Sequence, residues 1–274
     1  MTQPIAVVDA FTAEPYRGNP AGICVLAAPA SGGWMQSVAI EMNHAETAFL
    51  VKIRDGYDLR WFTPGGEVDL CGHATLASAH YLWETGVLGA EEQARFHTRS
   101  GLLTADRVLI DGAAWVELDF PGEPVSPAPA PDGLATMLGA EPVFVGRNRL
   151  DYLVELANEA IVRSLHPDLK QIAALSDAED ARGVIVTAAG ANSNADIVSR
   201  CFYPSFRIDE DPVTGSAHCG LAPYWIPRLA KPEIVAYQAS ARGGWLHLRI
   251  AGDRVKLRGQ AVTTLRGELL HSAS

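Results

Sequence analysis

The sequence predicts an α+β fold of two similar halves, each a rolled β-sheet around a buried central helix. The main observation is an internal repeat, because Arg-x-Phe-x-Pro occurs at Arg60–Pro64 and again at Arg200–Pro204. In each half, acidic residues, a small-residue turn and an apolar helix candidate follow, with Gly72 in one turn and Gly215 in the other. A repeat of this length indicates duplicated structure.

In the first half, strand candidates outnumber helix candidates. We expect strands at 5–8, 21–26, 47–53, 57–62, 108–111 and 115–120, and a helix at 34–43. Asp111-Gly112 favours a tight hairpin turn between the last two strands. The run from His73 towards Gly86 is apolar on most of its surface, which predicts a buried helix.

The second half repeats this order. We expect strands at 152–156, 183–187, 245–250 and 254–258, a helix at 168–175 and an apolar helical run at 221–229. Five prolines between Pro121 and Pro131 indicate a linker. The expected division is an N-terminal barrel-like domain at 1–122, a proline-rich linker at 123–138 and a C-terminal barrel-like domain at 139–274. The last residues are expected to be able to pack on the first domain.

The composition excludes several classes of protein. A net charge of −10 argues against nucleic acid and against an anionic membrane as partners. No apolar run approaches 18 residues and the N-terminus lacks a basic segment, so neither a membrane span nor a signal peptide is expected. The four cysteines have no C-x-x-C spacing, which favours reduced thiols in a cytoplasmic protein.

The two repeated turns are the first candidate binding site. A glycine before an apolar helix lets a ligand approach free backbone N–H groups, and the helix dipole favours an anion there. One such turn is more often only a tight turn. Two equivalent turns, at Gly72 and Gly215, favour an anion-binding cleft between the halves.

Two carboxylates are candidates for proton transfer. Glu46 precedes an apolar strand, so loss of hydration should raise its pKa from about 4.3 towards neutrality, where it can take and return a proton. The alternative is a solvated glutamate at a strand end. Asp211 lies three residues before Thr214 and could cap the helix or reach the cleft, although the acidic run at 209–211 otherwise indicates a solvated loop.

Other motifs are few. His73 is the one histidine at a repeated helix start, and the histidines near the motifs lack metal-site spacing. Cys71 could gain a lowered thiol pKa from a helix N-terminus, but its counterpart is Thr214, so a two-thiol pair is absent. Nucleotide, flavin, hydrolase and zinc motifs are missing, so neither a cofactor nor a metal is expected.

Blocks of sequence in both halves carry a family resemblance. They are Asp9–Thr12, Gly18–Ala21, Glu46–Phe49, Arg60–Thr75 and Glu210–His218. On these blocks the chain resembles the phenazine-biosynthesis isomerase-like family, a branch of the diaminopimelate epimerase fold superfamily. The resemblance implies two pseudo-symmetric domains, each a β-barrel-like roll around a central α-helix, with the active site between them and usually a homodimer.

The resemblance also implies roles for individual residues. Glu46 looks like the acid–base residue that moves a proton between carbons without a cofactor. Supporting proton-transfer and orienting groups are expected at His73, Asp211 and Ser216. Substrate-binding positions are expected at Asn19, Cys71, Gly72, Thr214 and Gly215, with the two glycines receiving a substrate carboxylate.

Two departures from the family pattern leave alternatives open. Ala45 stands where relatives often have serine, which puts the phenazine substrate in doubt, and at the repeated helix start one half offers Cys71 whereas the other offers Thr214. Our first hypothesis is a cofactor-independent isomerase of a small carboxylated metabolite, acting in the inter-domain cleft. The alternatives are a Cys71-dependent racemase, epimerase or dehydratase of an amino acid, and a non-catalytic homologue that binds a ligand or a protein.

Overall fold

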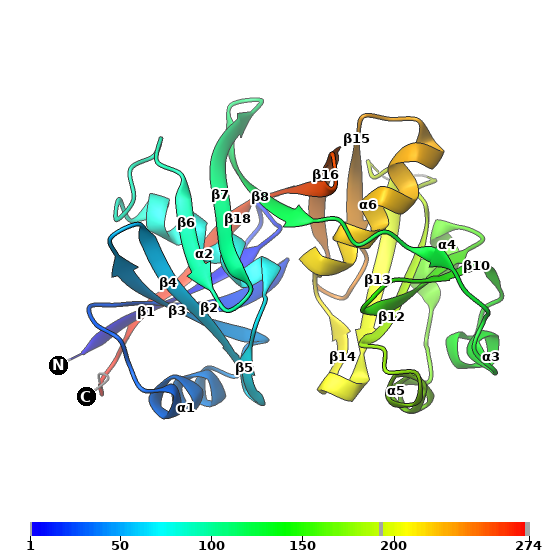
Figure 1. The fold of residues 1–274 in the computed structure, drawn as a ribbon, viewed down its shortest axis with the longest axis horizontal. Helices are drawn as coiled ribbons and strands as arrows, with labels where there is room; N and C mark the ends of the chain where they lie inside the picture. Colours follow the sequence, from blue (N-terminus) through cyan, green and yellow to red (C-terminus); the bar gives the residue numbers. More distant parts are fainter. Residues whose placement is uncertain (1, 192–193, 272–274) are drawn as a thin grey trace. The chain divides into compact units, whose positions relative to one another are not determined.

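The computed structural model describes residues 2–191 and 194–271, and the chain divides into two compact units (Figure 1). Unit 1 consists of Met1–Asp119 and Arg258–Ser274, and unit 2 of Phe120–Leu257. Each unit has many strands and few helices, in agreement with the predicted α+β class. No described helix has the length and apolar character needed to cross a membrane.

Unit 1 is built from nine strands and two helices among its described residues. They are β1 (Gln3–Ala10), β2 (Asn19–Leu26), α1 (Gly32–Met42), β3 (Glu46–Ile53), β4 (Gly56–Thr63), β5 (Gly66–Val68), α2 (Gly72–Glu84), β6 (Ala94–Thr98), β7 (Gly101–Ile110), β8 (Ala113–Pro121) and β18 (Ala261–Leu269). The predicted hairpin is present, because Asp111 and Gly112 both have positive φ between the antiparallel β7 and β8.

Unit 2 has the following described elements. They are β9 (Ser126–Pro127), α3 (Leu134–Leu138), β10 (Pro142–Arg147), β11 (Asp151–Leu156), α4 (Glu159–Ser164), α5 (Leu169–Ala178), β12 (Gly183–Ala189), β13 (Ile197–Tyr203), the 3₁₀ turn η1 (Pro204–Phe206), β14 (Ile208–Asp211), α6 (Gly215–Leu229), β15 (Glu233–Gln238), β16 (Gly244–Ala251) and β17 (Arg254–Gly259). The acidic run that indicated a solvated loop is therefore strand β14, and the strands β10, β13 and β15 were not predicted.

The repeat extends to strand pairing. In unit 1, β2 and β3 are parallel, β3 and β4 antiparallel, β4 and β6 parallel, and β6 and β7 antiparallel. In unit 2, the same succession joins β11 to β12, β12 to β13, β13 to β15, and β15 to β16. The two units are thus two versions of one topology.

The repeated Arg-x-Phe-x-Pro motif has the same structural task in both units. Arg60 in β4 donates to Glu67 in β5 through Nε and Nη2, at 2.6 and 2.7 Å, and its guanidinium lies 5.1 Å from the Phe62 ring. Arg200 in β13 donates in the same way to Glu210 in β14, at 2.7 and 2.9 Å. Two-point arginine–carboxylate pairs combine strength with fixed geometry, so they hold the hairpin before each central helix.

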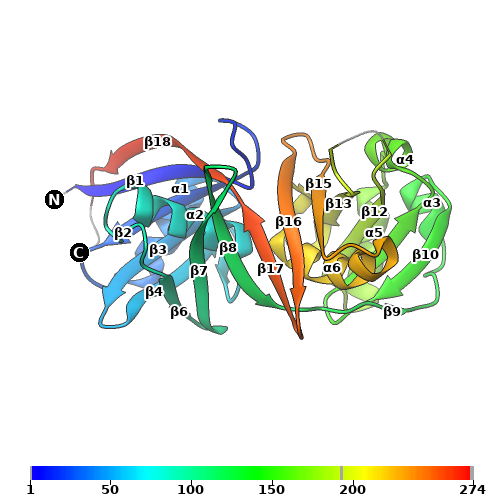
Figure 2. The ribbon, with the colours of Figure 1, turned by 90° about the horizontal axis from the view of Figure 1, so that it is seen from above.

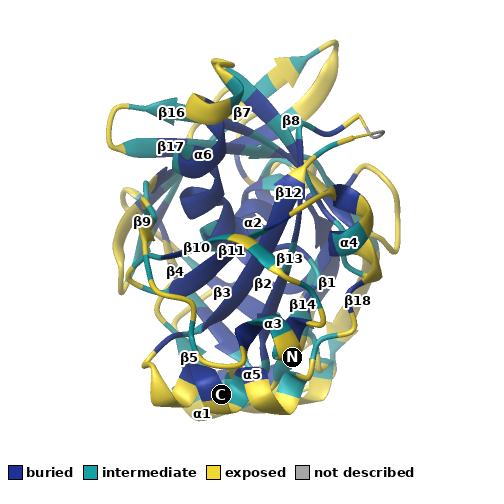
Figure 3. Ribbon diagram, turned by 90° about the vertical axis from the view of Figure 1, so that its right-hand side faces the viewer, coloured by how far each residue is buried: buried dark blue, intermediate teal, exposed yellow. Residues whose placement is uncertain are grey.

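The central helices α2 and α6 are enclosed, as Figure 3 shows by their dark blue ribbon. Buried residues occupy α2 from His73 to Ala79 and most of α6 from Gly215 to Ile226. The outer helix α1 differs, because it packs Met35, Val38 and Ala39 on the sheet and leaves its other side exposed. Packing therefore occupies the sides of each central helix, which leaves its ends for contact with a ligand.

Residues 123–138, expected to be a linker, belong to unit 2 and contribute β9 and α3. Proline has no N–H, so Pro223 inside α6 cannot bond to the carbonyl of Cys219. The N–H of Glu123 fills this place and donates to the Cys219 oxygen at 3.0 Å. The proline-rich composition indicated a linker at 123–138, whereas a backbone hydrogen bond holds the start of this segment on α6.

The C-terminal strand packs on the first unit, as the expected division at 139–274 allowed for the last residues. β18 pairs antiparallel with β1, from Gln3 opposite Leu269 to Ala10 opposite Ala261, and the two run side by side in Figure 2. Residues from Arg258 onward therefore belong to unit 1. Sequence periodicity could not show this, since the pairing joins the two ends of the chain.

The strand registers identify the unit 2 counterpart of Glu46. Ala21 pairs with Glu46 at the start of the parallel ladder in unit 1, and Asp151 pairs with Gly183 at the start of the ladder in unit 2. A Cβ atom at Gly183 would lie 2.1 Å from the carbonyl oxygen of Phe202. This position therefore has no room for a side chain in unit 2.

We expect Gly183→Ala to lower the free energy of unfolding by about 1–3 kcal/mol, because the added methyl group overlaps backbone that cannot yield cheaply. Urea denaturation measures the change. Gly33→Ala is the matched control, since a Cβ there meets nothing within 4 Å. Equal stability of the two variants would show that β13 can move away from β12.

Candidate functional site

The predicted residues of unit 1 gather at the start of α2. Asn19 begins β2, Glu46 begins β3, Cys71 is the N-cap of α2, and His73 is the second residue of that helix. Nε2 of His73 lies 3.2 Å from Oε2 of Glu46. On the other side of the ring, Nδ1 of His73 lies 3.3 Å from Nδ2 of Asn19 and 3.5 Å from Sγ of Cys71.

These contacts define the state of the imidazole. Burial lowers the pKa of His73 to about 3, so the ring is neutral near pH 7. The amide nitrogen of Asn19 can only donate, which makes Nδ1 the acceptor and places the proton on Nε2. That proton faces Glu46, whose side chain is only 13% exposed. The raised pKa expected for Glu46 stays a prediction.

Three of these side chains offer ligand atoms for a metal ion. Glu46, Cys71 and His73 each offer a ligand atom, and these atoms lie within 4.8 Å of one another. Carboxylate, thiolate and imidazole are the ligands of Zn²⁺, which takes four ligands in structural sites and three protein ligands plus water in catalytic sites. The expectation that the protein uses no metal therefore needs its own experiment.

The starts of the two central helices differ from those of α1, α4 and α5. Ser31, Asn158 and Asp168 cap α1, α4 and α5 by accepting backbone hydrogen bonds. Neither Cys71 nor Thr214 makes such a side-chain bond to the start of its helix. A helix start without a side-chain cap suits an anion, and the anion site expected at the two repeated turns stays a prediction.

In unit 2, the turn before α6 is held by side chains. The Thr214 hydroxyl donates to the carboxylate of Asp211. Gln238, fully buried, accepts from the Thr214 N–H at 2.8 Å and donates to the Asp211 carbonyl at 2.7 Å. Asp211 thus contacts the N-cap residue of α6 through its side chain, and Gln238 bonds to both ends of this turn.

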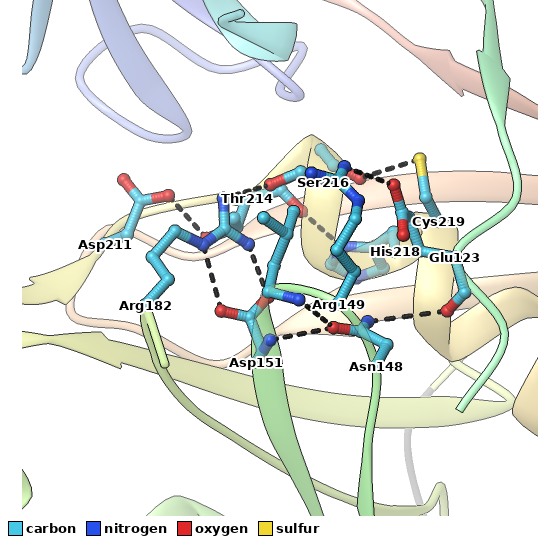
Figure 4. A network of polar contacts seen from close by, with 12 residues as sticks. Glu123, Asn148, Arg149, Asp151, Arg182, Asp211, Thr214, Ser216, His218 and Cys219 are labelled. Atoms are coloured by element: carbon cyan, nitrogen blue, oxygen red, sulfur yellow. Dashed lines mark hydrogen bonds and ion pairs between the residues drawn. The ribbon is translucent and has the colours of Figure 1, made fainter. Parts of the chain in front are cut away.

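Ser216 is the second residue of α6 and contacts an arginine that the sequence reasoning missed. Arg182 donates through Nη1 to the Ser216 hydroxyl oxygen at 2.8 Å, as Figure 4 shows. The rest of its guanidinium donates to Asp151 through Nε and Nη2, at 2.9 and 2.5 Å. Asp151 is 1% exposed, so this is a largely desolvated ion pair.

The nine predicted site residues therefore form two sets, one in each unit. Asn19, Glu46, Cys71, Gly72 and His73 make up the unit 1 set. The unit 2 set consists of Asp211, Thr214, Gly215 and Ser216. Sequence reasoning missed Arg182, Asp151 and Gln238. Arg182 and Asp151 each left a signal, because each directly precedes a predicted strand just as Glu46 does, whereas Gln238 left none.

Comparison with known proteins identifies the family of this chain. The family model described as phenazine biosynthesis-like protein matches residues 8–267. The chain belongs to the phenazine biosynthesis-like family. A curated relative from Halalkalibacterium halodurans, named an uncharacterized isomerase, is 53% identical over 271 residues, which cover 98% of this chain and 99% of the relative. Membership of this family supports isomerase chemistry.

Solved structures support the family and the fold. A phenazine biosynthesis protein of the same family from Enterococcus faecalis is 40% identical, with a TM-score of 0.91 over 99% of this chain and 100% of that protein. A probable proline racemase from Agrobacterium radiobacter shares the fold at 12% identity, with a TM-score of 0.65 over 98% of this chain and 93% of the other. The predicted diaminopimelate epimerase-like class of fold is therefore confirmed.

We expect His73 to stay neutral in the folded protein from pH 8 down to about pH 4, because burial holds its pKa near 3. NMR of the imidazole resonances checks this, with the urea-unfolded chain as reference, in which histidine titrates near 6.5. A folded-state midpoint near neutrality would contradict the buried, neutral ring.

The lowered pKa of His73 also makes the stability of the fold depend on pH. The unfolded chain binds a proton at His73 more readily than the folded chain does, so this group's contribution is present above pH 6.5 and is lost as the pH falls towards 3. His73→Gln should therefore flatten part of the acid limb of the stability curve.

Proposed function

We propose that the protein is a cofactor-independent isomerase that moves a proton between carbons of a small carboxylated metabolite. Glu46 takes the proton and returns it. The observation that carries this proposal is the position of Glu46, which lies at a strand end, is mostly shielded from solvent and faces the neutral Nε2 side of His73 at 3.2 Å.

The chemistry needs a base that also serves as an acid. The Glu46 carboxylate accepts a proton from one carbon, and the carboxylic acid so formed returns it to another carbon of the same molecule. Nε2 of His73 lies 3.2 Å from Oε2 of this carboxylate, and Asn19 contacts Nδ1 on the far side of the ring. Positioned proton transfer contributes about 10²–10⁴-fold in rate.

Removing a proton from carbon leaves negative charge on the substrate, which must be stabilised. The uncapped helix starts at Gly72 and Gly215 offer backbone N–H groups suited to a carboxylate or an enolate oxygen. We propose that Asp211 takes part beside Ser216. A cytoplasmic homodimer is the assembly we expect.

A second candidate function uses the thiol of Cys71. Its Sγ lies 3.5 Å from Nδ1 of His73 at a helix N-terminus, an arrangement that can activate a nucleophile or a base. The corresponding position in unit 2 is Thr214, so a racemase built on two thiols is not supported. A single-thiol eliminase or dehydratase of an amino acid is the form this candidate takes.

Glu46→Gln should reduce proton exchange by at least about 10²-fold, because the amide cannot accept a proton from carbon. The assay incubates the protein with a panel of small carboxylic acids in D₂O and follows deuterium incorporation by mass spectrometry. Thermal unfolding should show an intact fold. Glu41→Gln, an exposed glutamate on α1, is the matched control and should retain exchange.

Three results would contradict the proposal. Full exchange in Glu46→Gln would remove the glutamate from the mechanism. Exchange that is lost after chelation and restored by Zn²⁺ would assign Glu46, Cys71 and His73 to a metal instead. A wild-type protein that exchanges no acid of a broad panel would favour the non-catalytic homologue.

Cys71→Ser separates the two candidate functions. If Glu46 alone carries the proton, we expect this variant to keep exchange within about tenfold of the wild type. Iodoacetamide treatment of the wild type gives an independent reading, with the alkylated residue identified by peptide mapping. Loss of exchange in both experiments would favour the thiol-dependent reaction.

A further inference from the structure

We propose that Arg182 is a positioning residue that fixes the hydroxyl of Ser216 as a hydrogen-bond donor to an anionic group of the substrate. The inference rests on the proposed function and assigns a task to the unit 2 set. In this arrangement, Ser216 holds negative charge and does not relay protons.

Arg182 is held from several sides. Its Nε and Nη2 donate to the buried carboxylate of Asp151, and its guanidinium carbon lies 4.7 Å from the ring centre of Tyr203. Its backbone N–H donates to the carbonyl of Leu150 at 2.6 Å. A guanidinium restrained in this way keeps Nη1 in one place, 2.8 Å from the Ser216 oxygen (Figure 4).

The direction of this hydrogen bond decides what Ser216 can do. A guanidinium only donates, so the Ser216 oxygen accepts and its own hydrogen must point to another acceptor. A charged donor also polarises the hydroxyl and strengthens its outgoing bond. Free N–H groups of the α6 start lie beside it, and together these donors suit a carboxylate or enolate oxygen.

The repeat gives an independent argument. In unit 1, a side chain at the start of the parallel ladder, Glu46, reaches the second residue of the central helix, His73. In unit 2, the matching position, Gly183, has no room for a side chain, and Arg182 one residue earlier reaches Ser216. The same contact has thus changed from carboxylate–imidazole to guanidinium–hydroxyl.

This change separates the chemistry that is open to each set of residues. A carboxylate beside a neutral imidazole can accept and return a proton, whereas arginine stays charged at any physiological pH and cannot. We therefore assign proton transfer to the unit 1 set and stabilisation of negative charge to the unit 2 set. The substrate group received at Ser216 is an anionic oxygen.

A thiol at position 216 tests the assignment without a substrate. In Ser216→Cys, Arg182 should stabilise the thiolate and hold its pKa below the ordinary value of about 8.5. Adding Arg182→Gln with Asp151→Asn removes both charges of the ion pair and leaves no buried ion alone. The pKa should then rise by at least about one unit, which reduces alkylation at pH 7 by about tenfold.

The rate of iodoacetamide labelling against pH gives the thiol pKa, with peptide mass spectrometry to separate this site from the native cysteines. Arg149→Gln with Glu123→Gln is the matched control, because it removes another ion pair near α6, joined at 2.7 Å, that does not bond to Ser216. Equal shifts in both double variants, or no shift in either, would overturn the proposal.

Proton exchange gives a second readout once an exchanging acid is known. The loss caused by Arg182→Gln with Asp151→Asn should disappear in a Ser216→Ala background, since Arg182 acts through that hydroxyl. Additive losses would contradict the positioning role. A protein that exchanges nothing would refute the proposed function alone, because the thiol pKa measured in Ser216→Cys tests the role of Arg182 without a substrate.

Discussion

A helix enclosed by strands can meet a ligand only at its ends, and this constraint underlies the organisation of both units. The sides of α2 and α6 are occupied by packing, so their residues from the second turn onward serve the core. What remains are the first turns, where backbone N–H groups have no side-chain cap. The paired Arg60–Glu67 and Arg200–Glu210 contacts hold the hairpins that lead into these turns.

Within that shared frame, the two units have diverged at the residues that touch the helix start. In unit 1, the second residue of α2 is an imidazole, and a carboxylate and a thiol lie beside it. In unit 2, the second residue of α6 carries a hydroxyl, which bonds to a guanidinium that is itself held by a buried carboxylate. One frame thus supports two electrostatic environments, and a steric restriction at Gly183 contributes to the difference.

Sequence reasoning predicted the α+β class, the two central helices and the residues of the unit 1 set, because these depend on local periodicity and on a repeated motif. It missed features set by distant contacts. The proline-rich segment is fixed because Glu123 meets a carbonyl that Pro223 leaves open. The packing of the last residues on the first unit was expected, but their pairing with β1 and its register were not. Gln238 follows the turn that it holds by more than twenty residues, with no pattern linking them.

The pairing of β18 with β1 also bears on how the chain folds during synthesis. Unit 2 is a continuous segment inserted into unit 1, so its strands can pair as soon as residues 120–257 have emerged. Unit 1 must wait with the edge of β1 open, since its partner at 261–269 is made after unit 2. The inserted unit is therefore complete before unit 1 is, and during that interval the N-terminal strand is most exposed to wrong partners.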